Sequence, residues 1–314
     1  MSISPDGLFQ YGGSPVASAA YTNPWTTAYF VDGTNGTAGA GGKSPDDPTA
    51  TISQAITLAT AGDVIYVRQL LPIQSDMTDP TAYAENLVIP VAKHTLSIIG
   101  TGNNPHNPFY CQVKPSASGY GVEIKAVSTT IENLDFNRGS ATTGVIFFSG
   151  DNGTTDMGWG SLISNCHIRN ANGLANAGVK FEAGSYNTIY NCDFEACHTG
   201  VNLSSGGTFP IRSPRIERCR FKASNASAVG GDNIWGAGAA NILYEIEILD
   251  CYFERVPTGS FIDLSGANHY GIISNCHFGD DDVSCTTSGA NINKPTTVFV
   301  TGCYDDSGTM IATT

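Results

Sequence analysis

A row of ionisable and aromatic side chains occupies one position of a short repeated pattern in this chain. The row consists of Asp135, His167, Asp193, Arg220, Tyr252, His277 and Tyr304. Carboxyl and imidazole groups are common proton donors and acceptors in enzymes. If the repeats stack as strands about 4.8 Å apart, Asp135 and Asp193 lie about 9.6 Å from each other. Two carboxyl groups at that separation approach the geometry of an inverting glycosidase, and His167 would lie between them.

A second row, two residues further along each repeat, favours a structural explanation. It consists of Asn137, Arg169, Glu195, Lys222 and Glu254, and the sign of the charge alternates between repeats. Like charges in register repel each other, so a stable stack requires such alternation. We expect exposed pairs between Asp193 and Arg220 and between Glu195 and Lys222, each contributing about 0 to 1 kcal/mol. We therefore favour an ion-pair ladder and predict no catalytic residues. The alternative is a catalytic set of Asp135, His167, Asp193 and Arg220.

The repeated pattern itself predicts the fold class. It reads aliphatic, any residue, turn former, Cys or Leu, any residue, apolar, as in Ile163-Ser164-Asn165-Cys166-His167-Ile168. The central residues lie at positions 134, 166, 192, 219, 251, 276 and 303, so the period is 25 to 32 residues. A recurring period with loop insertions is typical of a solenoid. We predict an all-β solenoid of short parallel strands.

Each repeat also contains a predicted corner. Cys166 and Ile168 alternate as in a strand, whereas Ile163 and Cys166 are three residues apart and break the alternation. The residue at the corner is Asn133, Asn165, Asn191, Arg218, Asp250, Asn275 or Gly302. Asn, Asp and Gly tolerate left-handed backbone angles, and stacked Asn side chains can form hydrogen bonds along the ladder. A second strand that begins with Gly-Val recurs at Gly121, Gly144, Gly178 and Gly200.

An amphipathic helix near residues 51–61 is predicted to close the N-terminal end of the stack. Thr51 and Gln54 form a possible capping box, apolar residues follow on one face, and Gly62 ends the helix. A solenoid interior needs such a cover because an open coil exposes unpaired backbone groups. Asp305 takes an inward position otherwise held by Phe or Ile, so we expect the regular stack to stop there. The predicted division is an extended arm (1–27), a β-helix (28–305) and a tail (306–314).

Charge and cysteine content exclude several function classes. The formal net charge of −13 would repel a nucleic acid backbone and an anionic membrane surface, so we predict neither as a partner. No run of about 18 apolar residues is present, and Met1 to Gln10 lacks the order of a signal peptide. We therefore expect folding in a cytoplasm. The nine cysteines, an odd number without a C-x-x-C pair, are expected to be buried free thiols.

Five segments resemble the opening of pectate-lyase-like right-handed β-helix proteins. They are Tyr29–Gly33, Gly42–Pro45, Ala50–Ile52, Gly62–Val67 and Leu96–Gly100. The Asn-Cys corners resemble the same superfamily, and the resemblance extends over residues 28 to 305. It implies a right-handed single-stranded parallel β-helix. Lyases, hydrolases, adhesins and phage structural proteins share this fold, so the fold does not determine the function.

The N-terminal segment resembles the arm of a bacteriophage virion protein. Residues 1–27 show no helical or strand period, and an arm of this kind docks on a neighbouring subunit. The resemblance implies a virion location after folding in the host cytoplasm, with other virion proteins bound through residues 1–27. Trimers are common among phage β-helix proteins, so we expect a homo-oligomer, with a trimer as the implied form.

Our first functional hypothesis is a non-enzymatic virion structural protein, either a capsid decoration or a short spike, whose rod supplies stability and adheres to surface glycans. The alternatives are a polysaccharide-degrading tailspike, lyase or glycoside hydrolase, and a glycan-binding adhesin. Trp159, Trp235 and Tyr252 are candidate contacts to a glycan, such as host-surface polysaccharide, or to a protein partner.

Calcium is the one cofactor that the sequence suggests. Asp151, Asp156 and Asp280 lie in acidic loops and are candidate ligands, although neither loop has the spacing of an EF-hand. Lyases of the superfamily pair calcium-binding carboxylates with a basic residue, and no such set maps onto these repeats. This absence favours the non-enzymatic hypothesis, for which we predict no metal and no other cofactor.

Overall fold

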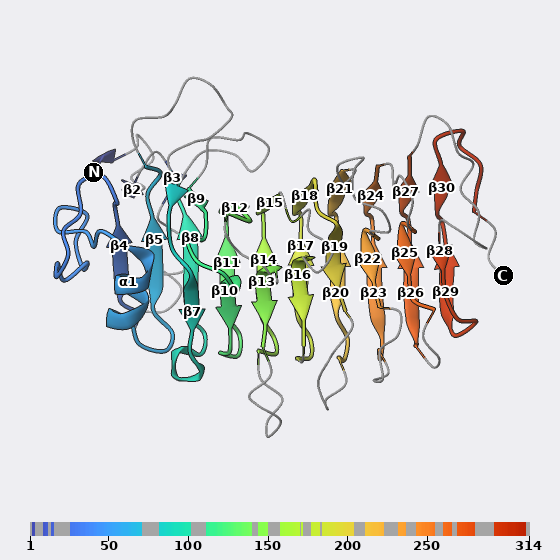
Figure 1. Ribbon diagram of the computed structural model, residues 1–314, viewed down its shortest axis with the longest axis horizontal. Coiled ribbons are helices and arrows are strands. Elements are labelled where there is room, and N and C mark those ends of the chain that lie inside the picture. The colour runs from blue at the N-terminus through green and yellow to red at the C-terminus, as the bar shows by residue number, and fades with distance from the viewer. Residues whose placement is uncertain are drawn as a thin grey trace.

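The computed structural model describes most of the chain between Thr26 and Ile311 and three short backbone segments before it. The described residues are 2–3, 9–11, 14–15, 26–70, 82–101, 111–139, 144–149, 158–169, 171, 177–182, 184–203, 211–222, 232–236, 243–254, 260–265, 269–279 and 292–311. They form a rod in which three parallel sheets run side by side along its length (Figure 1). The chain is a right-handed parallel β-helix, as predicted.

Each complete coil contributes one short strand to each of three sheets, named here by their number of described strands. The ten-stranded sheet contains β4 (Ala28–Val31), β5 (Val64–Val67), β8 (Ser97–Gly100), β11 (Thr130–Glu132), β14 (Leu162–Ser164), β17 (Thr188–Tyr190), β20 (Arg215–Glu217), β23 (Ile246–Leu249), β26 (Gly271–Ser274) and β29 (Val298–Thr301). The nine-stranded sheet contains β6 (Ala82–Tyr83), β9 (Gln112–Val113), β12 (Asp135–Asn137), β15 (His167–Arg169), β18 (Asp193–Glu195), β21 (Arg220–Lys222), β24 (Tyr252–Phe253), β27 (His277–Phe278) and β30 (Tyr304–Asp305). The eight-stranded sheet contains β7 (Leu87–Ile89), β10 (Tyr120–Ile124), β13 (Gly144–Phe148), β16 (Ala177–Phe181), β19 (Thr199–Asn202), β22 (Ile234–Trp235), β25 (Ile262–Asp263) and β28 (Ile292–Asn293).

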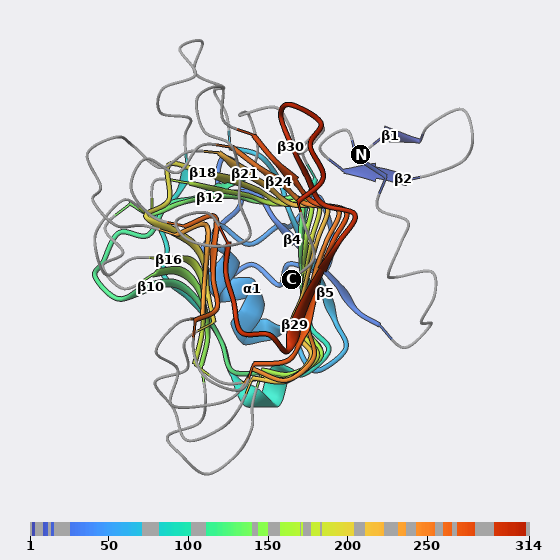
Figure 2. The same ribbon diagram turned by 90° about the vertical axis from the view of Figure 1, so that its right-hand side faces the viewer.

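Strands of successive coils pair in parallel, with equivalent residues in register. Ile131 is aligned with Ile163, and Ile163 with Ile189. Seen along the rod, the three sheets surround one interior (Figure 2). Because side chains alternate between the two faces of a strand, each inward position becomes a column along the rod. The recurring Gly-Val strands lie in the eight-stranded sheet, as β10, β13, β16 and β19.

The corner between the ten-stranded and nine-stranded sheets has the predicted backbone. All seven corner residues have positive φ, between 49° at Asn191 and 64° at Gly302. The Asn191 side chain donates a hydrogen bond to the Asn165 carbonyl Oδ1 at 2.7 Å, and Asn165 donates to Glu132 Oε1 at 3.2 Å. The predicted asparagine ladder is therefore present between these coils. Arg218 has the same conformation, with a φ of 54°, although Arg is not among the residue types that tolerate left-handed backbone angles well.

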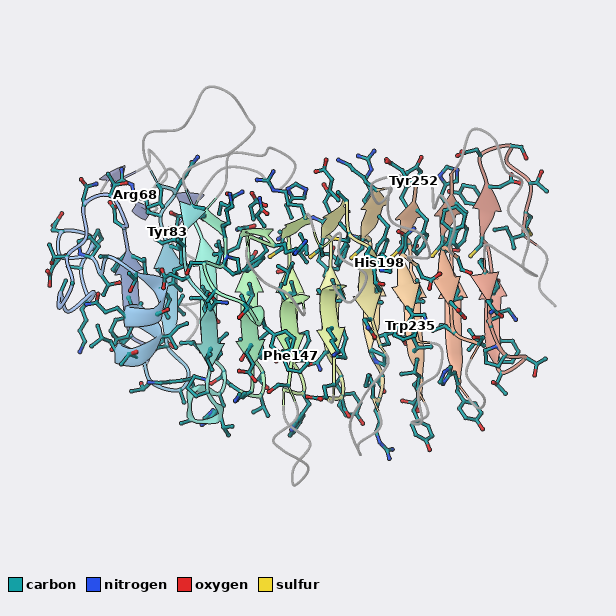
Figure 3. All side chains as sticks on the ribbon, in the orientation of Figure 1. Arg68, Tyr83, Phe147, His198, Trp235 and Tyr252 are labelled. Carbon is teal, nitrogen blue, oxygen red and sulfur yellow. The ribbon has the colours of Figure 1, made fainter. Side chains whose placement is uncertain are left out.

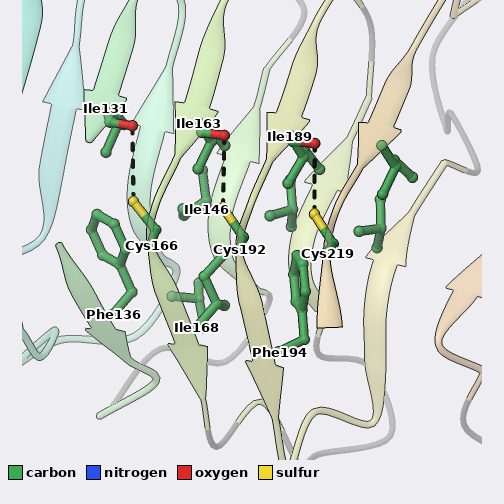
Figure 4. Packing of buried hydrophobic residues seen from close by; sticks show 14 of the residues in the cluster. Ile131, Phe136, Ile146, Ile163, Cys166, Ile168, Ile189, Cys192, Phe194 and Cys219 are labelled. Atoms are coloured by element: carbon green, nitrogen blue, oxygen red, sulfur yellow. Dashed lines mark hydrogen bonds between the residues drawn. The ribbon is translucent and has the colours of Figure 1, made fainter. Parts of the chain in front are cut away.

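The cysteines of the repeats form an axial column inside the corner (Figure 4). The thiol of Cys166 donates to the carbonyl of Ile131 on the preceding coil, at 3.8 Å. Equivalent hydrogen bonds join Cys192 to Ile163 at 3.7 Å and Cys219 to Ile189 at 3.6 Å. The eight cysteines that the structure describes are all buried and free, as predicted, whereas Cys285 lies outside the described residues.

A column of phenylalanines lies beside the thiols, on the inner face of the nine-stranded sheet. The rings of Phe194, Phe221, Phe253 and Phe278 follow one another with centroid separations of 4.7, 4.9 and 4.9 Å and nearly parallel planes. A shorter stack on the eight-stranded sheet joins Phe148 to Phe181 at 4.5 Å. These columns make the interior continuous from coil to coil.

The N-terminal end of the rod is covered by α1 (Ile52–Leu58), which packs against β4, β5 and β7. The Thr51 hydroxyl accepts from the Gln54 N–H, so the predicted N-cap is confirmed. The Gln54 side chain donates to the Ala40 carbonyl, and the Glu85 carboxylate instead accepts from the N–H groups of Ile52 and Ser53. The helix ends three residues earlier than predicted. A short 3₁₀ helix, η1 (Val91–Lys93), follows β7.

The C-terminal end closes on a polar turn. Asp305, in the inward column, is buried and accepts hydrogen bonds from the N–H groups of Ser307 and Thr309. The chain then folds back, so that Ile311 donates its N–H to the Cys303 carbonyl and is itself buried. Among the described residues the stack ends with β30, because the Asp305 carboxylate in this column needs the turn as its hydrogen-bond donor.

Within residues 1–27, where we predict an attachment arm, the structure describes three short strands. They are β1 (Ser2–Ile3), β2 (Phe9–Tyr11) and β3 (Ser14–Pro15), which pair as an antiparallel sheet. The attachment role of this segment remains a prediction. Among the described residues, no helix is long and apolar enough to cross a membrane.

Candidate functional site

The predicted row of ionisable side chains lies along the outer face of the nine-stranded sheet. Asp135 is aligned with His167, His167 with Asp193, and Asp193 with Arg220. Tyr252, His277 and Tyr304 continue the row on β24, β27 and β30. The second predicted row is also in register, from Asn137 through Arg169 and Glu195 to Lys222. The strands β12, β15, β18 and β21 thus present two outward positions each, one on either side of an inward residue.

Asp135 is enclosed by groups that satisfy its carboxylate. Its side chain has no exposed surface. Arg169 binds it with two hydrogen bonds, from Nε to Oδ1 at 3.1 Å and from Nη2 to Oδ2 at 2.9 Å. Gln112 donates to Oδ2 at 2.7 Å, and His167 Nδ1 lies 3.5 Å from Oδ1. A substrate cannot reach this carboxylate in the observed arrangement.

His167 contacts the coil before its own, through Asp135, and the coil after it, through Glu195. Its Nε2 lies 2.9 Å from Glu195 Oε2, while the opposite ring nitrogen faces Asp135. The hydrogen bond from His167 lowers the pKa of Glu195, and the charges of His167, Lys222 and Arg169 act in the same direction. The imidazole therefore bridges two carboxylates, and the three coils from β12 to β18 are connected on their outer face.

The ladder continues toward the C-terminus with a different pairing. Arg220 forms an ion pair with Glu254 through Nε, at 2.9 Å, and through Nη2. Its guanidinium carbon also lies 5.7 Å from the centre of the Tyr252 ring. The rings of Tyr252, His277 and Tyr304 follow at 4.8 and 5.1 Å, and His277 Nε2 lies 3.1 Å from Asp306 Oδ1. These contacts run between coils rather than outward to solvent.

Gln112 is a member of this network that the sequence analysis missed. It lies on β9, directly beside Asp135 on β12. Cys111-Gln112-Val113 has the cysteine, outward and apolar residues of the repeat but lacks the preceding corner residue. A search for the last three positions alone would have found this earlier coil. The Cys111 thiol donates to the Val67 carbonyl, as the other thiols do to theirs.

The three aromatic residues proposed as glycan or partner contacts lie apart from one another. Trp159 lies in the turn before β14, an internal strand of the ten-stranded sheet, and is 46% exposed. Trp235 is half-buried on β22 of the eight-stranded sheet, and Tyr252 lies on β24 of the nine-stranded sheet (Figure 3). They do not form one surface, so any contact that they make is separate.

The candidate calcium ligands Asp151, Asp156 and Asp280 lie outside the described residues. Within the described part of the chain, no group of three or more His, Cys, Asp or Glu side chains is placed to hold a metal ion.

Comparison with known proteins supports the fold. Residues 101–234 match the family model described as a right-handed β-helix region. No curated protein matches the chain in sequence. Polysaccharide lyases and phage proteins are among the similar solved structures.

Three solved structures illustrate this likeness. Pectate lyase Pel9A is 14% identical, with a TM-score of 0.47 over 91% of this chain and 72% of its own. ORF18 of Geobacillus virus E2 is 12% identical, with a TM-score of 0.46 over 89% of this chain and 62% of its own. The tailspike protein gp49 of Acinetobacter baumannii bacteriophage Fri1, a capsular polysaccharide depolymerase, is 12% identical with a TM-score of 0.44. That match covers 81% of this chain but only 49% of the tailspike.

Proposed function

We propose that the chain is a non-enzymatic structural protein of a bacteriophage particle, either a capsid decoration or a short spike. This proposal rests on one observation: the outward charged side chains pair with each other between coils. Arg169 and His167 bind Asp135, His167 binds Glu195, and Arg220 binds Glu254. Each pair joins one coil to another, so these groups stabilise the rod. A buried, fully bonded Asp135 suits that role better than proton transfer to a substrate.

The interior supports the same role. Columns of thiols and phenyl rings run through successive coils without a polar interruption until Asp305. A solenoid of this kind is stabilised by the contact of each repeat with its neighbours. In the proposed particle the rod is the durable element, residues 1–27 bind another virion protein, and the assembly is a homo-oligomer, with a trimer as the form we expect. Adhesion to a host polysaccharide is a further expectation.

The substitution Asp135→Asn should lower the free energy of unfolding by about 2 kcal/mol, because hydrogen bonds to charged groups contribute about 1.5 to 3 kcal/mol. The variant keeps its shape but loses the charge that faces Arg169 and His167. Chemical denaturation followed by circular dichroism measures the change. Asp250→Asn is the matched control, since Asp250 is exposed at a corner where Asn is tolerated and its replacement should cost less than about 0.5 kcal/mol.

A polysaccharide lyase or glycoside hydrolase is the second candidate, favoured by the alignment of His167 between Asp135 and Asp193. Activity assays of Asp135→Asn and of Asp193→Asn distinguish the two functions. For an enzyme, we expect the natural protein to release reducing ends or unsaturated products from a polysaccharide. If Asp135→Asn or Asp193→Asn loses this activity without losing stability, the function is catalytic and not structural.

Deletion of residues 2–25 should prevent incorporation of the protein into virus particles while leaving a folded rod. The deletion stops there because Thr27 donates its N–H to Asp63 and accepts from the Val64 N–H, and so belongs to the first coil. Incorporation is measured by the amount of protein in purified particles, and folding by circular dichroism. Particles that contain the truncated protein at the natural level would contradict the attachment role.

A further inference from the structure

Four apolar side chains form a cluster on the outer face of the ten-stranded sheet, on its first three coils. This outer cluster consists of Phe30 on β4, Val64 and Tyr66 on β5, and Ile99 on β8. Its members point away from the interior, because their strand neighbours Ile65 and Ile98 belong to the central core. Phe30 is aligned with Tyr66, and Tyr66 with Ile99. The rings of Phe30 and Tyr66 stack with a centroid separation of 5.8 Å.

The outer cluster is buried although it lies on an outward face. Its four side chains are between 2% and 8% exposed. On the next coil the same two outward columns hold Thr130 and Glu132, which are partly exposed, and at the far end of the sheet the outward Phe299 is strongly exposed. A side chain on the outer face of a sheet is removed from water where another segment of protein covers it. The first three coils therefore carry a covering segment that the later coils do not share.

The N-terminal segment joins the rod at this cluster. Ala28, the first residue of β4, packs against it, and the hydrogen bonds of Thr27 with Asp63 and Val64 hold the chain beside β5. Figure 2 shows β1 and β2, which come earlier in this segment, on the outer side of the ten-stranded sheet. An extended chain spans about 3.3 Å per residue, so residues 16–25 are long enough to cross the two strand spacings, about 9.6 Å, between β4 and β8.

The composition of residues 16–25 matches an apolar surface. They carry no charged side chain, and they include Tyr21 and Trp25. Two loops follow the strands of the outer cluster, but residues 71–81 lead to β6 and residues 102–110 lead to β9, so both cross to the nine-stranded sheet. Only residues 16–25 adjoin the cluster without having to reach another sheet.

We propose that residues 16–25 dock on the outer cluster of their own chain, with Tyr21 and Trp25 covering Phe30 and Tyr66. The contact holds the second half of the N-terminal segment on the rod. Residues 2–15, which contain β1 to β3, are then the part that is free to bind another virion protein. That last role rests on the proposed function, whereas the contact itself requires only one chain.

The contact is tested by photo-crosslinking in the full-length protein with the variant Tyr21→p-benzoylphenylalanine. Irradiation should link this residue to β4, β5 or β8 of the same chain, and mass spectrometry of the digested protein identifies the linked peptides. Tyr270→p-benzoylphenylalanine is the matched control. Tyr270 is exposed beside β26 of the same sheet, so it should give no link to residues 28–100. Absence of a link from residue 21 to the three strands, or links between chains alone, overturns the proposal.

A charge within the outer cluster should release the segment. In Tyr66→Glu, chymotrypsin should cleave after Tyr21 and Trp25 about tenfold faster than in the natural protein, because a buried carboxylate disfavours the docked state. Ile272→Glu places the same charge at an outward position of β26, beyond the cluster, and should leave the rate unchanged. Equal cleavage rates in Tyr66→Glu and the natural protein would contradict the docking.

Ile99→Thr keeps the test decisive if Tyr66→Glu does not fold. Threonine retains the β-branched shape that suits a strand but exposes a hydroxyl to the segment above it. Cleavage after Tyr21 and Trp25 should rise severalfold while circular dichroism shows an intact rod, and an unchanged rate in the folded variant refutes the contact. All of these measurements use the isolated protein, so their failure is distinct from a failure of residues 2–25 to direct incorporation into particles.

Discussion

The free energy of unfolding should fall steeply once the pH rises above about 8.5. Burial raises the pKa of the thiols of Cys192, Cys219 and Cys251 well above its ordinary value and that of Cys197 to about 12. In the unfolded chain these thiols ionise near pH 8.5. Below that pH both states hold their protons, and the stability from the buried thiols is fully present. Between the unfolded and folded pKa values only the unfolded state loses protons, so stability decreases.

The expected slope is large because the thiols act together. Each contributes about 1.4 kcal/mol per pH unit, so four contribute about 5 kcal/mol per pH unit well above pH 8.5. Since domains are stable by about 5 to 15 kcal/mol, the rod should unfold at moderately alkaline pH. Urea denaturation at pH 8, 9 and 10, in the presence of a reductant, measures the slope.

A double variant controls for the other groups that titrate at alkaline pH. Cys192→Ala with Cys219→Ala removes two of the four thiols and leaves every Lys and Tyr in place. Its stability at pH 8 is lower because two cavities are created. Its alkaline slope should be smaller by about 3 kcal/mol per pH unit. An unchanged slope would show that the alkaline transition comes from groups other than the thiol column.

Phe221→Ala should lower the free energy of unfolding by about 3 to 5 kcal/mol, the range observed for truncation of fully buried aromatic side chains. The ring is fully buried between Phe194 and Phe253, at centroid separations of 4.7 and 4.9 Å. Gly200 lies directly against it, since a side chain at that position would contact the ring. The neighbouring coils cannot close a gap here without changing their register.

The matched control for this substitution is Phe299→Ala. Phe299 lies on β29 and is 69% exposed, so its replacement should change stability by less than about 0.5 kcal/mol. Thermal unfolding followed by circular dichroism compares the two variants with the natural protein. Similar stabilities for both would mean that the phenylalanine column contributes little and that the corner and thiol column hold the coils together.

The repeated pattern was sufficient to predict the stacking, because its signals are local. The three-residue interval from Ile163 to Cys166 indicates a corner, and the alternation from Cys166 to Ile168 indicates a strand. Asn165 lies at that corner with a φ of 51°, and Cys166 and Ile168 both face the interior. Once these residues stack in register, the outward row of Asp135, His167 and Asp193 follows without knowledge of the intervening loops.

The partners of the charged residues depend on the tertiary structure. Long side chains reach diagonally from one outward row to the other. Arg169 therefore binds Asp135, and Arg220 binds Glu254, each on a neighbouring coil. The same applies to α1, where Glu85, distant in sequence, accepts from the first N–H groups of the helix.

The outer cluster on β4, β5 and β8 belongs to no repeated pattern, because these strands precede the first complete copy of the repeat at Ile131. The sequence alone therefore determined the coils, their register and the columns inside them, since alternation and backbone preference act over a few residues. Only the tertiary structure decided which charges meet and which outward apolar side chains are buried, because both depend on segments that lie far apart in the chain.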